Sequence, residues 1–398
     1  DIQNNLEEKI TRACAELDFN PIAPRYDIGS LARALKKNDR LVEFIKYRPY
    51  DFNKKGFEKD RFGAERYLAF ILSSSEQVDI FDIAEAHMVD SLIGIYRQRL
   101  YESPADLTEN RIKESEKYIN EISSKLYALI YGPLSERLAG AEIIYLCPDG
   151  ALNLIPFEAL RAPDESYLIE KNHFSYLSSG RDLLRIKKES PNNKKALIFA
   201  DPDFDYRPEL KEAARPKETL ALLTGWSSGP ERGNYCLATP FGSLPSSRQE
   251  ALAVERLLMN GSHYKVSGYF GPEATEEQIK GEKEPPTILH IATHGYFCDF
   301  ATDTSNESYI NPLLGSGLAL AGANRLFDMN NKEQVGEDGI LTAYEVSNFN
   351  LLGTELATLS ACETGIGKTI NAEGVYGLRR AFQHAGAHSI LMSLWKVP

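Results

Sequence analysis

The sequence predicts an α/β protein in which a mainly parallel sheet is flanked by helices. From Ile143 onward, short apolar runs typical of buried strands alternate with stretches whose apolar residues recur at helical spacing. The 398 residues exceed what one compact core usually holds, so we expect two packed lobes. Apolar residues make up 42% and charged residues 26% of the chain, which is ordinary for a globular protein with a sizeable core.

The N-terminal part is expected to contain a helical segment followed by an α/β lobe. Residues 1–36 carry apolar side chains at helical spacing and could be the end of a helical array. Within the lobe, residues 37–189, the apolar runs 41–47 and 67–72 are separated by polar residues and predict paired strands. The pattern then becomes helical from about residue 83 to 131, with a break at Ser103-Pro104.

The second lobe is expected to span residues 190–398, with the boundary near Pro191-Asn192-Asn193. Two long polar segments, about residues 202–246 and 298–337, interrupt its pattern, and loops of that length are usually functional or mobile. Short apolar runs predict strands at residues 143–146, 196–199, 264–266, 288–291, 356–359 and 389–392, the first of which precedes the boundary.

Composition argues against several kinds of partner. The formal net charge of -12 repels phosphate backbones, so nucleic acid is not expected as a direct partner. No apolar run approaches the roughly 20 residues that span a bilayer, so no membrane association is expected. The five cysteines have no short regular spacing, which favours neither a disulfide framework nor a zinc ribbon. We therefore expect a cytoplasmic protein in a reducing compartment.

Two predicted strands end in groups that suit catalysis. One runs through residues 287–293 into His294-Gly295, and the other runs through residues 356–361 into Cys362. In open α/β sheets, ligands bind beyond the carboxyl ends of the strands. A free thiol, with a pKa of about 8.5, needs a neighbouring base to become a good nucleophile at neutral pH. His294 and Cys362 are therefore the candidate catalytic residues, and the N–H groups of Gly295 and Cys362 are the candidate oxyanion hole.

Other roles for the histidines are weaker alternatives. His290, His294 and Cys298 recur every four residues, as zinc ligands on a helix would. Their flanking residues predict a strand, on which His290 and His294 would lie about 13 Å apart, too far for one zinc ion. We interpret His290 as a satisfied core histidine and Cys298 as a loop thiol. His384 falls in a predicted helix and His388 opens the last strand, so both are expected to be structural.

A nucleotide-binding loop is a further alternative. The run Gly365-Ile366-Gly367-Lys368-Thr369 contains a Gly-Lys-Thr fragment, but it misses the spacing of a phosphate-binding loop.

From roughly residue 130 to 398, the sequence resembles the CHAT-domain proteases, which are related to caspases and separases. The region from Leu41 to Arg99 also looks like the strands and helix that commonly precede such domains. The motifs that carry the resemblance are Pro148-Asp149-Gly150, Ile155-Pro156-Phe157-Glu158-Ala159-Leu160, Leu244-Pro245, Glu250-Ala251, Thr293-His294-Gly295, Gly339-Ile340-Leu341-Thr342-Ala343, Leu359-Ser360-Ala361-Cys362-Glu363-Thr364-Gly365, Glu373-Gly374-Val375-Tyr376-Gly377-Leu378, Ala385-Gly386-Ala387 and Ser393-Leu394-Trp395.

The resemblance implies a caspase-like fold in which His294 is the general base and Cys362 the nucleophile of an endopeptidase. This enzyme is expected to act through an acyl-enzyme without a metal ion or an organic cofactor. It also implies a helical repeat region before Asp1, of the tetratricopeptide type, through which a regulatory partner would bind. Related proteases act in bacterial defence and cell death. Family members usually continue past the Trp395 motif, so we expect that the remainder is disordered, that it is removed by processing, or that the chain is cut short, and the fold could still be complete.

Substrate preference and activity leave alternatives open. Related enzymes often cleave after a basic residue, and an acidic pocket would pair with Arg. Glu363 and Asp299 are the candidate pocket acids, because they lie near the dyad in sequence. The segment from Pro202 to Leu244 falls outside the family pattern and is a candidate lid or self-cleavage site. A catalytically silent scaffold that binds proteins is the alternative to a protease.

Overall fold

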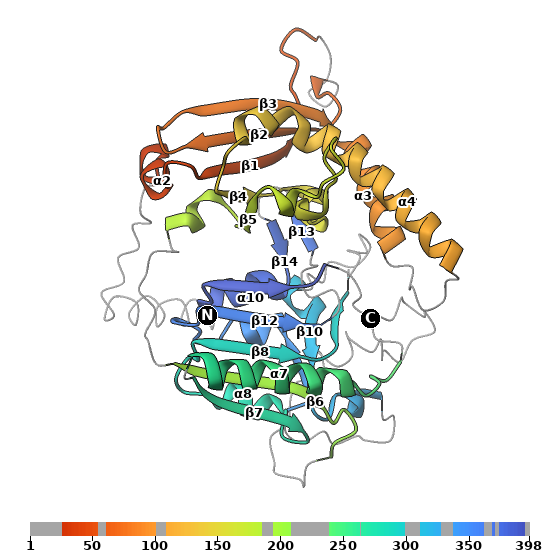
Figure 1. The fold of residues 1–398 in the computed structure, drawn as a ribbon, viewed down its shortest axis with the longest axis vertical. Coiled ribbons are helices and arrows are strands. Elements are labelled where there is room, and N and C mark those ends of the chain that lie inside the picture. The colour runs from red at the N-terminus through yellow and green to blue at the C-terminus, as the bar shows by residue number, and fades with distance from the viewer. Residues whose placement is uncertain are drawn as a thin grey trace, which may run out of the picture.

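Two lobes, each built around a five-stranded sheet, make up the computed structural model of the protein (Figure 1). The structure describes residues 26–54, 61–100, 109–184, 194–207, 239–262, 264–298, 311–327, 337–361, 368–370 and 374–394. Of the predicted helical segment 1–36, the structure therefore describes only residues 26–36. They contain the helix α2 (Ile28–Ala34), whose N-cap residue is Asp27.

The first sheet has the strand order β3-β2-β1-β4-β5. Its strands are β1 (Arg40–Tyr47), β2 (Arg66–Ser73), β3 (Val78–Glu85), β4 (Ile143–Cys147) and β5 (His173–Tyr176). β1 pairs antiparallel with β2, which confirms the predicted pair of strands at residues 41–47 and 67–72. On its other side β1 pairs parallel with β4, so this sheet is mixed.

The strand β3 differs from the sequence prediction, which placed the start of a helical region at about residue 83. Val78 and Ile80 are exposed on this edge strand. Apolar residues therefore lie on both faces of β3, so the sequence lacks the alternation of apolar and polar residues that predicts a strand, although backbone pairing with β2 holds β3 in the sheet. The helices α3 (Ala86–Leu100) and α4 (Glu109–Leu126) then follow, as expected for this region, and α5 (Ser135–Leu138) precedes β4.

The second sheet is parallel throughout and has the order β15-β12-β8-β6-β7. Its strands are β6 (Lys195–Pro202), β7 (Lys265–Gly271), β8 (Ile288–Ala292), β12 (Leu356–Ser360) and β15 (Ser389–Met392). All five were predicted as strands from their apolar runs, and the sixth predicted strand, 143–146, is β4 of the first sheet. The mainly parallel sheet flanked by helices is thereby confirmed.

Helices cover both faces of this sheet. α7 (Pro245–Ser262) packs on the face that carries Ile198, Ala200 and Ala292. The opposite face, with Phe199 and Ile291, packs against α8 (Glu276–Lys280), α9 (Ala343–Val346) and α10 (Leu378–Ala385). Because side chains alternate along a strand, each strand contributes to both cores.

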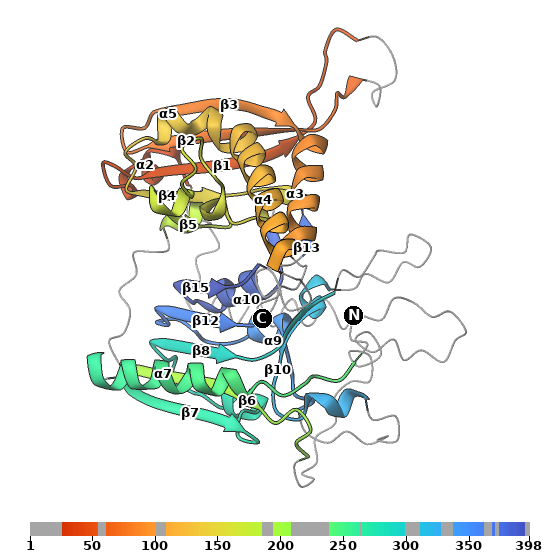
Figure 2. The ribbon, with the colours of Figure 1, turned by 45° about the vertical axis from the view of Figure 1, so that its right-hand side comes forward.

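Two small antiparallel sheets complete the second lobe. One contains β9 (Gly295–Phe297), β10 (Ser316–Ala319) and β11 (Ile340–Thr342), in the order β11-β10-β9. The other is the hairpin of β13 (Lys368–Ile370) and β14 (Gly374–Tyr376), which contacts the short 3-10 helix Gly150–Leu154 of the first lobe. Figure 2 shows that this hairpin lies at the junction of the two lobes.

Side-chain contacts also join the lobes. The guanidinium of Arg379, on α10, donates a hydrogen bond to the Leu177 carbonyl at 3.1 Å and lies 5.8 Å from the ring centre of Tyr176. Ser178 donates to the side-chain oxygen of Gln383 at 2.7 Å. α10 therefore packs against the parallel sheet on one side and bonds the residues that follow β5 on the other.

Replacing Arg379 by Ala should loosen the junction between the lobes. The variant loses a charge-assisted hydrogen bond and a cation–π contact, and we expect a loss of about 2 kcal/mol in the free energy of unfolding. Urea unfolding measures the loss, and faster amide exchange at residues 177–182 locates it. His384→Ala, at an exposed position of the same helix, is the control. Equal stability of the two variants would contradict a role for Arg379 in docking.

Candidate active site

The site begins where β8 and β12 end side by side. Ala292 is the register partner of Ser360, and one residue later the Thr293 N–H donates to the Ser360 carbonyl at 3.2 Å. The buried Thr293 hydroxyl donates to the Ala319 carbonyl at 2.5 Å, which ties the end of β8 to β10. The backbone that leads into His294 is thus fixed by bonds to two different sheets.

The imidazole of His294 has a defined environment. Its Nε2 lies 2.8 Å from the Gly242 carbonyl oxygen, on the segment that precedes α7. The rings of Phe204 and Phe241, which both precede His294 in the sequence, have centroids 5.3 and 5.6 Å from the imidazole. A carbonyl oxygen can only accept, so Nε2 carries the proton and Nδ1 is left with a lone pair.

Asn324 holds the segment that reaches His294. Its side-chain oxygen accepts from the Phe241 N–H at 2.7 Å, and its side-chain nitrogen donates to the Phe241 carbonyl at 3.1 Å and to Asp205 at 2.9 Å. Its own backbone N–H donates to the Phe204 carbonyl at 2.9 Å. One residue therefore positions both phenylalanines that contact the imidazole. Sequence reasoning missed it, because no motif marks an asparagine that binds backbone groups.

Gly295 opens the edge strand β9. Ala319 donates its N–H to the His294 carbonyl at 2.9 Å, which makes these two residues a hydrogen-bonded antiparallel pair. The next pair, Gly295 with Leu318, is then of the type whose backbone groups point away from the partner strand. The Gly295 N–H is consequently directed away from β10, as a donor to a bound group would need to be.

Three of the sequence-predicted site residues, Cys362, Glu363 and Asp299, lie outside the described residues. The chain is described up to the buried Ala361, whose carbonyl accepts a hydrogen bond from the Ser393 hydroxyl at 2.5 Å. The structure therefore positions the base candidate and the residue before the nucleophile candidate.

The structure also places the other histidines, cysteine and lysine that the sequence analysis weighed as alternatives. His290 is buried on β8 and its Nε2 lies 3.3 Å from Glu250, while the atom makes no hydrogen bond, so the expectation of a satisfied histidine is wrong. Cys298 follows β9, is buried and is disulfide-bonded, so it is not the loop thiol that the sequence suggested. His384 is exposed on α10, and Lys368 starts a strand instead of the helix of a phosphate-binding loop.

One acidic cluster in the described part of the chain has the ligand spacing of a metal site. Oxygens of Glu276, Glu337 and Glu345 lie within 4.8 Å of one another. The ammonium group of Lys280 lies among them, with Nζ–O distances of 2.7, 2.8 and 2.9 Å. Lys280 thus occupies the position that a cation would take, and the cluster fastens α8 to α9 and to Glu337, three residues before β11.

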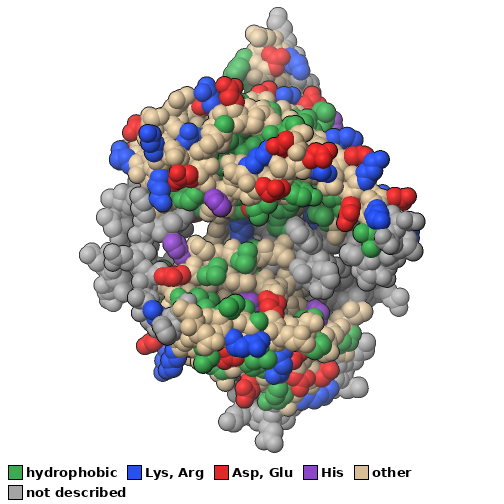
Figure 3. All heavy atoms as spheres, viewed as in Figure 1, with side chains coloured by type: hydrophobic (Ala, Val, Ile, Leu, Met, Phe, Trp, Pro, Cys, Tyr) green, Lys and Arg blue, Asp and Glu red, His purple; other side chains and the backbone are tan. Residues whose placement is uncertain are grey.

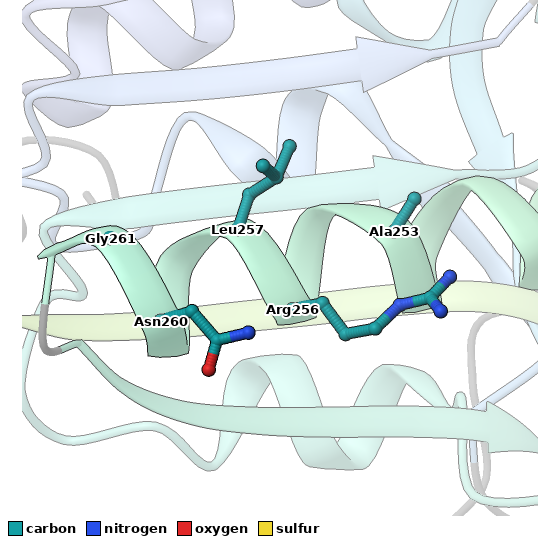
Figure 4. Close-up of a pocket in the computed structure, with 5 residues that line it drawn as sticks. All are labelled: Ala253, Arg256, Leu257, Asn260 and Gly261. Carbon is teal, nitrogen blue, oxygen red and sulfur yellow. The ribbon is translucent and has the colours of Figure 1, made fainter.

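Two surface features, the distribution of charged side chains and a hollow along α7, do not involve His294. Lys and Arg side chains are interspersed with Asp and Glu over the visible face of both lobes (Figure 3). A hollow runs along α7 and is lined by Ala253, Arg256, Leu257, Asn260 and Gly261 (Figure 4). It lies in the second half of α7, whereas the Gly242 carbonyl precedes the start of that helix. The hollow is therefore a feature of the amino-end side of the sheet.

Replacing Lys280 by Met should destabilise the second lobe. The change leaves three carboxylates close together, and Glu276 has no exposed surface on which its charge could be hydrated. We expect a loss of about 3 kcal/mol in the free energy of unfolding. Urea unfolding of Lys280→Met beside Lys283→Met, an exposed lysine on the following loop, is the measurement. A loss no larger than that of Lys283→Met would refute the assignment.

The parallel sheet with helices on both faces, and a histidine at the carboxyl end of a central strand, define a caspase-like α/β fold. The family model of the CHAT domain matches residues 120–398, and the chain belongs to this family. No helix in the described ranges is long and apolar enough to cross a membrane.

Two curated relatives match about two thirds of the chain. Tetratricopeptide repeat protein 28 of Mus musculus is 25% identical over 293 residues, and that of Homo sapiens is 27% identical over 293 residues. The match covers 69% of this chain and 11% of each relative. The chain therefore corresponds to a small part of these longer proteins.

Proposed function

We propose that the protein is a cysteine endopeptidase whose catalytic dyad is His294 and Cys362. The hydrogen bond between His294 Nε2 and the Gly242 carbonyl carries the proposal, because it leaves Nδ1 as a base. The register of the strands supports it, since His294 follows Ala292 by two residues and Cys362 follows Ser360, the register partner of Ala292, by two residues.

The proposed mechanism uses groups of this chain and water. Nδ1 of His294 takes the proton of the Cys362 thiol, and the thiolate forms a bond to the carbonyl carbon of the scissile peptide. The N–H groups of Gly295 and Cys362 donate to the oxyanion. The C–N bond then breaks, the leaving amine takes the proton from the imidazolium, and water hydrolyses the resulting thioester with His294 as base.

The proposal also covers the substrate, the pathway and the regulation of the enzyme. The substrate would be a protein cleaved after a basic residue, within a regulated defence or cell-death pathway, as the family resemblance implies. The mouse and human relatives both carry tetratricopeptide repeat in their names. This supports the proposal that a regulatory partner acts through helical repeats.

Loss of either dyad residue should abolish peptide hydrolysis. We expect Cys362→Ala and His294→Ala to retain less than about one thousandth of the wild-type kcat/KM on fluorogenic peptides, because nucleophile and base act as a unit. Selective labelling of Cys362 by a chloromethyl ketone gives a second readout. A wild-type protein that neither cleaves peptides nor reacts with the label would favour a silent scaffold.

Asn324→Asp should lower kcat about tenfold or more and leave KM nearly unchanged. The new carboxylate faces the Phe241 carbonyl and the Asp205 carboxylate, which the Asn324 amide nitrogen now bonds. The Gly242 carbonyl would then move relative to His294, while substrate contacts stay intact. Asn348→Asp, at an exposed position after α9, is the matched control. An unchanged kcat in Asn324→Asp would exclude a positioning role.

A further inference from the structure

Glu250, on α7, lies against the end of β12. Its Oε2 accepts a hydrogen bond from the Ser360 hydroxyl at 2.9 Å, and its Oε1 lies 3.3 Å from His290 Nε2. Ser360 is the last residue of β12 and comes two residues before Cys362. The carboxylate is therefore held beside the strand that leads to the proposed nucleophile.

The negative charge of Glu250 is left uncompensated by its neighbours. Arg248, the basic residue two positions earlier, pairs with Asp201 at 2.8 Å and lies over the ring of Phe270. Burial lowers the pKa of His290 in spite of the attraction of Glu250, so this imidazole is uncharged at neutral pH. Among the residues that the structure describes, Glu250 makes no ion pair with a lysine or an arginine.

Glu250 is also accessible. Its side chain is 42% exposed, so an incoming cation can reach it without displacing a core residue. The Ser360 hydroxyl donates to it and keeps lone pairs that can accept from a second donor. An acid and a hydroxyl side by side are a suitable receptor for a guanidinium or an ammonium group.

We propose that Glu250 is the specificity-determining acid that binds the basic side chain on the amino side of the scissile bond. This inference rests on the proposed endopeptidase activity. Two residues of chain span at most about 7 Å in any conformation, so Ser360 lies within the reach of a long Arg or Lys side chain from a carbonyl that Cys362 attacks. The planar guanidinium of Arg can bond both Glu250 and Ser360, so Arg is preferred over Lys.

The test compares the full chain with two variants on matched peptides. The fluorogenic peptides differ only in the residue before the cleaved bond, which is Arg, Lys, norleucine or Asp. Glu250→Gln keeps the shape and the acceptor for Ser360 but removes the charge. Glu255→Gln, on the same helix, is the matched control. Glu250→Asp keeps the charge and checks that a loss in Glu250→Gln is electrostatic.

The wild-type protein is expected to prefer Arg, and Glu250→Gln to lose about 10- to 100-fold in kcat/KM on the Arg and Lys peptides. Hydrolysis of the norleucine peptide should stay within twofold in the same variant, which shows that the dyad is intact. Glu255→Gln should behave as wild type, and Glu250→Asp should retain most of the preference for Arg.

Three results would overturn the inference, and two of them leave the endopeptidase proposal intact. Cleavage of the norleucine or Asp peptide in preference to Arg, or an Arg preference that survives Glu250→Gln, excludes Glu250 as the specificity acid while the protease remains. If the wild type cleaves no peptide and Cys362 reacts with neither an Arg nor a norleucine chloromethyl ketone, the endopeptidase proposal fails and this inference fails with it.

Discussion

Residues Ile288–Ala292 of β8 pair one to one with Leu356–Ser360 of β12. Because the pairing is parallel, the carboxyl ends of the two strands lie side by side. A shift of one residue would turn His290 from the α7 face to the opposite core and would separate Thr293 from the Ser360 carbonyl. The apolar residues that alternate on the two faces prevent such a shift, because each has a helix to pack against. The position of His294 thus depends on the hydrophobic pattern of these two strands, whose apolar side chains pack against helices on both faces of the sheet.

Polar side chains hold the irregular segments where the sheet cannot. Asn324 fastens the chain before α7 to the chain after β6, and Lys280 joins α8 and α9 through three carboxylates. Their partners are largely buried or half-buried, so each bond is formed in a medium where an unsatisfied group is costly. The regular sheet fixes the position of the imidazole, and the bonds of Asn324 hold the segments of Phe204 and Phe241 that contact it.

The sequence predicted the regular parts of the fold well and the site in part. All five strands of the parallel sheet are short apolar runs bounded by polar residues. This pattern alone is enough to identify them in the sequence. β3 was missed because Val78 and Ile80 are exposed, and β9, β10 and β11 are too short to show a period. His294 could be recognised because a histidine followed by glycine closes a strand. Asn324 and the Glu250–Ser360 pair could not, since they meet only through long-range contacts.

The partner of the His294 imidazole is a main-chain oxygen, that of Gly242. Every amino acid carries the same carbonyl group, so no substitution at residue 242 can delete it, and comparison of residue types cannot reveal it. Only the path of the backbone determines whether the oxygen is in reach. Selection on such a group acts on the residues that shape the loop, and relatives can conserve the interaction while the residue that supplies it drifts.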